Sequence, residues 1–224
     1  MNALELTGQA RTHTVDIAAP PCTLHVHAAA PFLNLRRAAA AAGFDLKPVS
    51  TFRDFQHQLA IWNAKFNGER PLYDASGHPL DALRLAPSER IEAILQWSAL
   101  PGASRHHWGT DLDLIDANAI APGYRVQLTA AEFSGTGPFA PLTDWLAAHA
   151  ARFGFFLPFR GVRSGVQGEP WHYSFAPLAE PARRSLTPAV LRAALTAAPL
   201  AGREIVMARL EEWHSRFVAP IDWP

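Results

Sequence analysis

Two short polar motifs, far apart in the chain, place the strongest constraint on its fold. The first, Ser104–Asp113, contains adjacent histidines and two aspartates, and the second, Glu169–His172, ends on a histidine three positions after a glutamate. Two imidazoles and one carboxylate can hold zinc while leaving a fourth tetrahedral position open to water. A carboxylate three residues before the last histidine stands where a general base for that water is expected. The fold must therefore bring both motifs to one site.

Cysteine cannot supply the ligands of such a site. The chain has a single cysteine, Cys22, so neither a cysteine-rich structural zinc site nor an internal disulfide can form. Histidine and carboxylate side chains must carry any metal, and this donor set favours a catalytic centre over a closed structural one.

The sequence around each motif predicts a β-strand. Apolar and polar residues alternate along Thr110–Ile115, which places Asp111 and Asp113 on the same face of a strand. In the second motif, aromatic residues alternate with His172 and Ser174, so the histidine points away from the aromatic face. The expected site therefore lies on one face of a small sheet.

The motifs resemble those of the VanY-type D-alanyl-D-alanine carboxypeptidases, zinc metallopeptidases that share a superfamily with the hedgehog fold. The family pattern is S-x-H-x-x-G-x-A-x-D followed by E-x-W-H. The matching residues are Ser104, His106, Gly109, Asp113, Glu169, Trp171 and His172. The resemblance runs from about Val49 to Phe175, and the two motifs together make it specific.

The resemblance implies a complete catalytic zinc centre. His106, Asp113 and His172 would ligate Zn²⁺, and Glu169 would be the general base for a zinc-bound water that acts as the nucleophile. The family register selects His106 over its neighbour His107, because adjacent histidines in an irregular segment do not easily reach one metal.

Three further residues near the motifs have expected roles. Ser50–Arg53 resembles the family's S-x-[YF]-R segment, so Arg53 either polarises the scissile carbonyl or binds a substrate carboxylate, with a surface residue of a first helical turn as the alternative. Ser104 either contacts substrate or holds its loop. Asp111 occupies the family's alanine position, where it either hydrogen-bonds a group behind the ligands or faces solvent.

Length and composition limit the remaining possibilities. A chain of 224 residues with 49% hydrophobic content is expected to form a single domain over 1–224 with an ample core. Its 20 basic and 20 acidic residues leave no positive surplus for nucleic-acid binding. No apolar run approaches the roughly 18 residues of a membrane span.

The amino-terminal segment Met1–Gly8 carries no secretory signal pattern, which predicts a cytoplasmic protein. Family members that trim the cell wall usually act outside the cytoplasmic membrane. A periplasmic or wall-associated location is therefore the alternative.

The periodicity along the chain, together with the resemblance, predicts an α+β fold. A small, mainly antiparallel sheet would carry the zinc site on one face and helices on the other. The metallopeptidase core would span about 23–178, followed by a C-terminal helical extension over about 186–218 that packs on the core or mediates self-association. Expected helices cover 33–42, 55–66, 88–100, 142–153, 188–198 and 203–217; further strands cover 23–28, 44–50 and 155–159, with a turn at 160–165 and a long loop at 67–87.

The function implied by the resemblance is zinc-dependent D,D-carboxypeptidase activity. The substrates would be peptidoglycan-derived cell-wall peptides that end in D-alanyl-D-alanine. An L,D-carboxypeptidase and a wall-lytic endopeptidase use the same machinery and stay open as alternatives. A non-catalytic zinc module that binds wall peptides or protein partners is the alternative of a different class, and Glu169 argues against it because a structural site has no use for a general base.

Overall fold

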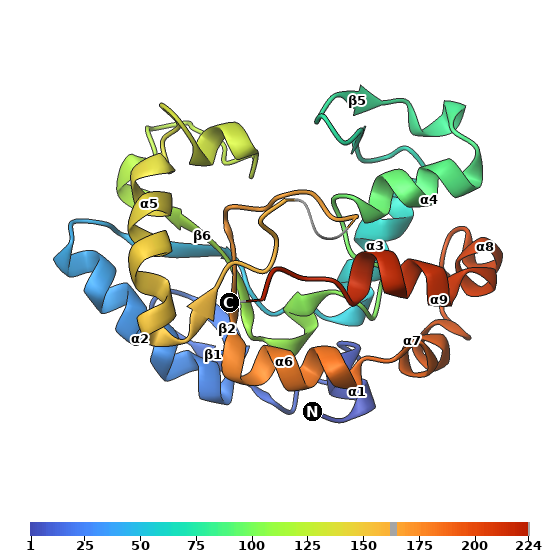
Figure 1. Cartoon of the computed structure of the whole chain (residues 1–224), viewed down its shortest axis with the longest axis horizontal. Coiled ribbons are helices and arrows are strands. Elements are labelled where there is room, and N and C mark those ends of the chain that lie inside the picture. The colour runs from blue at the N-terminus through green and yellow to red at the C-terminus, as the bar shows by residue number, and fades with distance from the viewer. Residues whose placement is uncertain (162–164, 224) are drawn as a thin grey trace.

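A four-stranded antiparallel sheet forms the centre of the computed structural model, which describes residues 1–161 and 165–223 (Figure 1). Its strands run in the order β3 (Leu46–Ser50), β6 (Asp111–Asp116), β8 (His172–Phe175) and β7 (Phe155–Phe156). Helices surround this sheet. The expected α+β fold class is confirmed.

The register of the sheet brings the two sequence motifs side by side. β6 pairs with β8 so that Asp113 lies opposite His172 and Leu112 opposite Tyr173. On its other edge β6 pairs with β3, where a register shift after Pro48 places Ser50 opposite Asp113. Strand pairing alone therefore places three segments, distant in sequence, around one aspartate.

Two helices cover the sheet and enclose an apolar core with it. They are α2 (Val26–Ala41) and α5 (Ala140–His149), the latter continued by a 3₁₀ turn over Ala150–Phe153. The buried residues of this core come from both helices and from all four strands, among them Phe32, Leu35, Leu46, Leu112, Leu146, Phe155 and Tyr173. The alternation expected for β6 places its leucines in this core.

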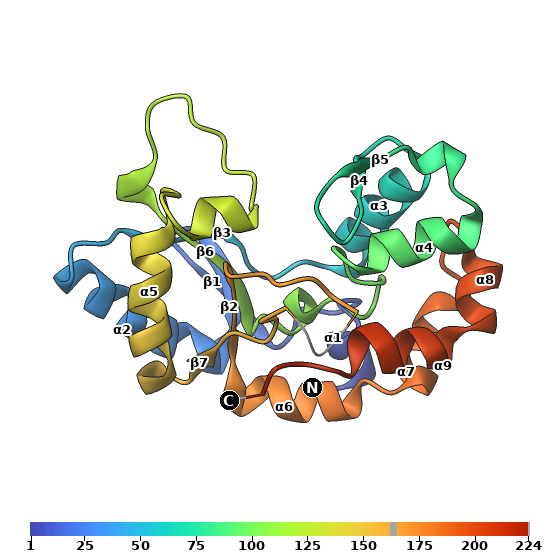
Figure 2. The same cartoon turned by 45° about the horizontal axis from the view of Figure 1, so that its top comes forward.

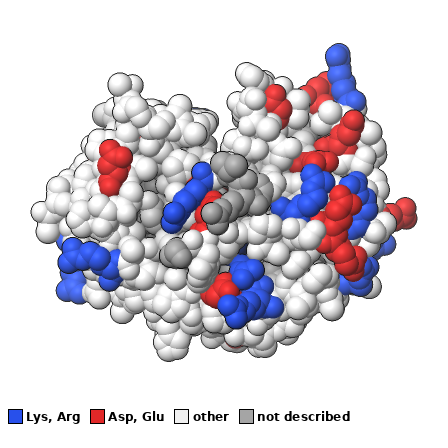
Figure 3. Space-filling model, in the orientation of Figure 1, with Lys and Arg blue, Asp and Glu red and all other residues white. Residues whose placement is uncertain are grey.

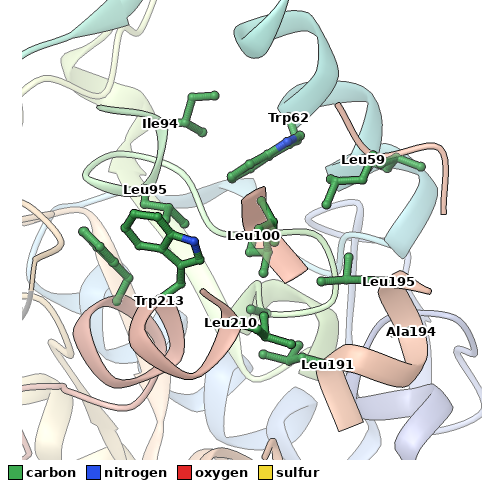
Figure 4. Packing of buried hydrophobic residues seen from close by; sticks show 14 of the residues in the cluster. Leu59, Trp62, Ile94, Leu95, Leu100, Leu191, Ala194, Leu195, Leu210 and Trp213 are labelled. Carbon is green, nitrogen blue, oxygen red and sulfur yellow. The ribbon is translucent and has the colours of Figure 1, made fainter. Parts of the chain in front are cut away.

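A second, larger core lies on the other side of the molecule. It joins α3 (Phe55–Phe66) and α4 (Pro87–Leu95) to three helices from the C-terminal part of the chain. These are α7 (Pro188–Leu195), α8 (Arg203–Ala208) and α9 (Leu210–Trp213). Figure 4 shows Trp62, Leu100, Leu191 and Trp213 among the side chains packed here.

The remaining elements are short, apart from α6. They are α1 (Ala3–Leu6), β1 (Thr14–Ile17), β2 (Cys22–His25), β4 (Leu72–Tyr73), β5 (Pro79–Leu80), α6 (Ala176–Ser185), a π-helical turn over His214–Val218, and 3₁₀ turns over Ala82–Arg84, Arg105–Trp108, Ala117–Ala119 and Ala130–Phe133. In Figure 2, α2 and α5 stand on one side and α3, α4 and α8 on the other.

Several local expectations differ from the structure. The strand expected over 23–28 ends at His25, because the Nδ1 atom of His25 accepts a hydrogen bond from the backbone N–H of His27 and begins α2 there. Helix α6 was not expected. Pro177 lies in its first turn, where proline is tolerated, and Pro181 lies inside the helix. Residues 162–164 of the expected turn lie outside the described residues. No helix of the described chain is both long and apolar enough to cross a membrane.

Candidate metal centre and substrate cleft

His106 sits on a 3₁₀ turn, Arg105–Trp108, that closes on a glycine. Gly109 has a φ of 65°, and a Cβ there would lie 2.6 Å from the backbone nitrogen of His25, so the turn needs glycine on both counts. The Nδ1 atom of His106 lies 2.9 Å from the carbonyl oxygen of Thr51. Since a carbonyl only accepts, Nδ1 carries the proton and Nε2 is left as a free donor atom for a metal.

Three buried side chains converge beside this turn. One candidate ligand atom from each of His106, Asp113 and His172 lies within 4.8 Å of the other two. His106 Nε2 is 3.5 Å from Asp113 Oδ2, and His172 Nδ1 is 3.2 Å from Asp113 Oδ1. Asp113 Oδ1 is buried and has no hydrogen-bond partner among the described residues, because its contact with His172 lacks hydrogen-bond geometry. The donor set and this orphaned oxygen fit a zinc ion.

The charges of this cluster depend strongly on one another. Burial opposes the ionisation of Asp113, but His106 and His172 outweigh it and hold the pKa of this carboxyl well below its usual range. Burial also opposes protonation of His172, whereas Asp111, Asp113 and Glu169 raise its pKa well above the ordinary value. The site therefore has a strong affinity for positive charge.

Glu169 lies at the edge of the cluster. Its Oε2 is 3.3 Å from His172 Nδ1, and its side chain is 14% exposed. The backbone N–H of Glu169 donates to the carbonyl of Phe159, and the N–H of His172 donates to the carbonyl of Glu169. This local turn places the carboxylate next to the ligand atoms and open to the cleft.

Arg53 lines the same cleft and is held by neighbouring polar groups. Its Nη1 donates to Gln58 Oε1 at 2.7 Å and its Nη2 donates to Ser50 Oγ at 2.9 Å. Burial lowers the pKa of the Arg53 guanidinium, and Asp113 and Glu169 oppose this effect. Gln58, which sequence reasoning missed, is fully buried and donates to the carbonyl of Ala99. Arg53 precedes the N-cap of α3 while Gln58 lies inside that helix, five positions later, so no helical spacing in the sequence marks the pair.

His107 turns away from the metal centre. Its Nδ1 lies 2.5 Å from the backbone oxygen of Arg53, and its Nε2 accepts from the N–H of Gly102 at 3.1 Å. Complete burial lowers the pKa of His107 to about 3, so the ring is neutral. With both nitrogens engaged, His107 holds the backbone of Arg53.

Asp111, the departure from the family pattern, is a buried partner of His172. Its Oδ1 is 2.9 Å from His172 Nε2 and accepts from Arg105 Nε at 2.8 Å. Burial opposes ionisation of Asp111, but the Arg105 guanidinium and the bonds from His172 and Thr110 prevail and hold its pKa below the usual range. Of the two expectations for Asp111, the hydrogen bond behind the ligands is the one that the structure contains.

The cluster lies in a cleft of about 610 Å³. Ser104 lines it, and its hydroxyl makes no side-chain hydrogen bond to any residue that the structure describes, which favours substrate contact over a role in holding the loop. The other walls come from the Gln127–Ala131 segment, from α3 and from the hairpin loop around Tyr73. The face drawn in Figure 3 is notched between the two halves of the molecule.

Comparison with known proteins places the chain in a family. Residues 22–178 match the family model of VanY, D-alanyl-D-alanine carboxypeptidase. The chain belongs to this family. The resemblance drawn from the motifs is confirmed, and so is the enzyme class, a carboxypeptidase of peptidoglycan-related chemistry.

Individual proteins and solved structures are also similar to the chain. An uncharacterized protein of Haemophilus influenzae is 36% identical over 121 residues, which cover 53% of this chain and 92% of that protein. The solved structure of VanYB in complex with D-Alanine-D-Alanine shares the fold with a TM-score of 0.56, at 18% identity over 85% of this chain and 92% of that one. A VanY D,D-pentapeptidase mutant from a VanB-type resistance cassette, in complex with Zn(II), gives a TM-score of 0.54 at 20% identity, covering 88% of this chain and 91% of that one.

Proposed function

We propose that this member of the VanY family is a zinc-dependent D,D-carboxypeptidase that hydrolyses the terminal D-Ala-D-Ala bond of peptidoglycan-type peptides. The observation that carries the proposal is the convergence of His106, Asp113 and His172 within 4.8 Å, with the Glu169 carboxylate 3.3 Å from His172. The family match and the Zn(II) and D-Alanine-D-Alanine complexes of proteins with this fold support the choice of metal and substrate.

His106 Nε2, His172 Nδ1 and the Asp113 carboxylate would hold the metal. Bound Zn²⁺ polarises a carbonyl and lowers the pKa of water toward about 7. Glu169 accepts a proton at its carboxylate and returns it to the leaving amine, a role that its position beside the ligand atoms permits. Its backbone hydrogen bonds fix the turn that carries this side chain.

Arg53 and Ser104 orient the peptide. The Arg53 guanidinium is fixed by Gln58 and Ser50, so its planar donors are preorganised for negative charge that develops on the scissile carbonyl. The Ser104 hydroxyl lines the cleft and is free to bond the peptide backbone.

Mass spectrometry of defined muropeptides tests the proposal. The zinc-loaded protein should convert a pentapeptide that ends in D-Ala-D-Ala into the tetrapeptide plus one D-alanine. Glu169→Gln should retain zinc and bind the peptide, yet turn over about 10²- to 10⁴-fold more slowly, because the amide cannot accept the proton. Cleavage of only the L,D bond of a tetrapeptide would identify an L,D-carboxypeptidase instead. Cleavage of only internal cross-links would identify an endopeptidase. No cleavage of any of these peptides by the wild type would contradict the enzyme proposal.

A further inference from the structure

Asp111 lies directly behind the metal centre, at the position where the family pattern has alanine. Its side chain is completely buried. Oδ1 is shared between His172 Nε2 at 2.9 Å and Arg105 Nε at 2.8 Å, and Oδ2 accepts from Thr110 Oγ1 at 2.6 Å. Arg105 Nη2 also donates to Ser174 Oγ at 2.6 Å. One carboxylate thus joins a candidate metal ligand to a buried arginine.

This hydrogen bond fixes the ring of His172. An ionised carboxylate only accepts, so Nε2 donates its proton to Asp111, which leaves Nδ1, 3.2 Å from Asp113 Oδ1, as the ring nitrogen that would bind a metal. His106 is oriented differently, by the neutral carbonyl of Thr51. Because a charged acceptor bonds a histidine more strongly than a carbonyl does, His172 is the more firmly held of the two rings.

Arg105 makes the buried carboxylate tolerable. Its side chain is 7% exposed, and its guanidinium lies 4.8 Å from the centre of the Trp108 ring. The pair is neutral as a whole, and removing either charge alone leaves the other buried without its partner. The contact therefore acts as a unit and must be tested as one.

We propose that Asp111, held by Arg105, is a positioning residue that turns Nδ1 of His172 toward the metal and raises the affinity of the site for zinc. The inference rests on the metal centre of the proposed function. Alanine at the same position could make no such contact, so this chain is expected to bind zinc more tightly than its own Asp111→Ala form.

Zinc affinity, measured by competition with a chromophoric chelator, tests the role without any assay of peptide cleavage. Asp111→Asn should weaken zinc binding by about 10- to 100-fold. Asp116→Asn is the matched control, because Asp116 is a 9% exposed carboxyl at the far end of β6, and within the described part of the chain it accepts hydrogen bonds only from the backbone N–H groups of Asp45 and Asn118. It should leave zinc affinity unchanged.

A double variant tests whether a loss of zinc binding in Asp111→Ala comes from misfolding. Arg105→Leu combined with Asp111→Ala removes both charges, so it should recover stability relative to Asp111→Ala while keeping the weakened zinc binding. The inference about Asp111 would be wrong if the Asp111 variants that fold bound zinc within about twofold of the wild type, or if Asp116→Asn lost as much zinc affinity as they do. Either result would leave the proposed metal centre in place. Absence of zinc binding in the wild type would overturn the proposed metal centre, and this inference with it.

A second inference comes from Lys65, which is not one of the candidate metal ligands. It sits in the last turn of α3 and lines the same cleft as Arg53 and Glu169. Its ammonium makes no hydrogen bond or ion pair with any residue in 1–161 or 165–223. Burial lowers the pKa of Lys65 to about 8, so most of it is still protonated at neutral pH. Glu169 attracts this charge, whereas Arg53 and Arg70 repel it.

We infer that Lys65 Nζ binds a free carboxylate of the peptide substrate, an inference that also rests on the proposed function. A cation largely withdrawn from water without an anionic partner is costly, and a carboxylate entering the cleft relieves that cost. Arg53 already bonds Gln58 and Ser50, whereas Lys65 has all three donors available. The carboxylate is either the C-terminal one or that of a diamino-acid side chain within the peptide.

Three peptides distinguish the two sources: the unmodified pentapeptide, its C-terminal amide, and the form with an amidated side-chain carboxylate. Lys65→Met should lower kcat/KM for the unmodified peptide by about 10- to 100-fold, since hydrogen bonds between charged groups are worth about 1.5–3 kcal/mol. The loss should vanish for whichever amidated peptide lacks the bound carboxylate. Lys47→Met, at an exposed position of β3, controls for net charge.

Calorimetry in the Glu169→Gln background measures the same contact without turnover. Lys65→Met should weaken binding of the unmodified peptide and leave one amidated peptide unaffected. An equal loss for all three peptides, in kinetics and in binding, would show that Lys65 has only a structural role. Binding that depends on Lys65 in a protein without hydrolytic activity would retain this inference while the proposed reaction failed.

Discussion

At the scale of single residues, the contacts of Arg53 in the cleft depend on the planar shape of its guanidinium as much as on its charge. Arg53 donates through Nη1 to Gln58 and through Nη2 to Ser50, while the ring of His107 contacts its backbone oxygen. A lysine at this position would keep the charge but not the fixed pair of donors.

Arg53→Lys should therefore leave zinc content and thermal stability near wild type and lower kcat/KM by about 10²- to 10³-fold. Steady-state kinetics on the D-Ala-D-Ala peptide, with zinc determined by elemental analysis, provide the measurement. Arg70→Lys, at an exposed position, is the control and should behave as wild type. Wild-type turnover and affinity in Arg53→Lys would remove Arg53 from carbonyl or carboxylate recognition.

The residue types of the site could be predicted from the sequence, whereas the contacts behind them could not. His106, Asp113 and His172 could be named as candidate metal ligands from the sequence, because strand alternation and the family pattern agree on them. The partner of Asp111 depends on the register of β6 against β8, which no local pattern encodes. His107 likewise reaches the backbone of Arg53 only through the tertiary fold.

At the scale of elements, strong local sequence patterns predicted the helices and strands correctly, and weak patterns did not. α3 covers the expected residues 55–66, with Asp54 as its N-cap, and β6 follows its alternation. The start of α2 was misplaced, because the alternation of Thr23–His27 indicates a strand until His25 caps the helix through its ring. Capping by histidine is uncommon, so the pattern carried no warning.

The cap at His25 predicts acid sensitivity of the fold. Burial, followed by repulsion from His13 and His27, lowers the pKa of His25 to about 4, below the ordinary value of about 6.5. The unfolded chain therefore binds the proton first, and stability falls as pH drops from about 6.5 toward about 4. His25→Asn keeps an N-cap acceptor without this titration. Urea unfolding with chelator present, at pH about 7.5 and about 5, should show a smaller loss of stability in His25→Asn; an equal loss would reject the role.

At the scale of the whole molecule, the metal centre lies where the two cores meet. The sheet core contains Leu112 and Tyr173, the neighbours of two ligands, while the helical core contains Trp108, on the same turn as His106. Trp108 Nε1 also donates to the carbonyl of Leu6, which ties the amino-terminal segment to this turn. A metal held by both halves is therefore expected to stabilise the entire fold, since binding free energy adds to folding free energy.

Removal of zinc should lower the melting temperature of the wild type by about 10 °C, given about 4 kcal/mol at a thousandfold excess over Kd and about 2–4 °C per kcal/mol for a chain of this size. His172→Ala should contain little zinc, and chelator should leave its melting temperature unchanged. His57→Ala, on the exposed face of α3, should respond to chelator as the wild type does. Scanning calorimetry with and without chelator gives the comparison. A full chelator-dependent shift in His172→Ala would mean that the stabilising metal is bound elsewhere, and the ligand assignment would then be wrong.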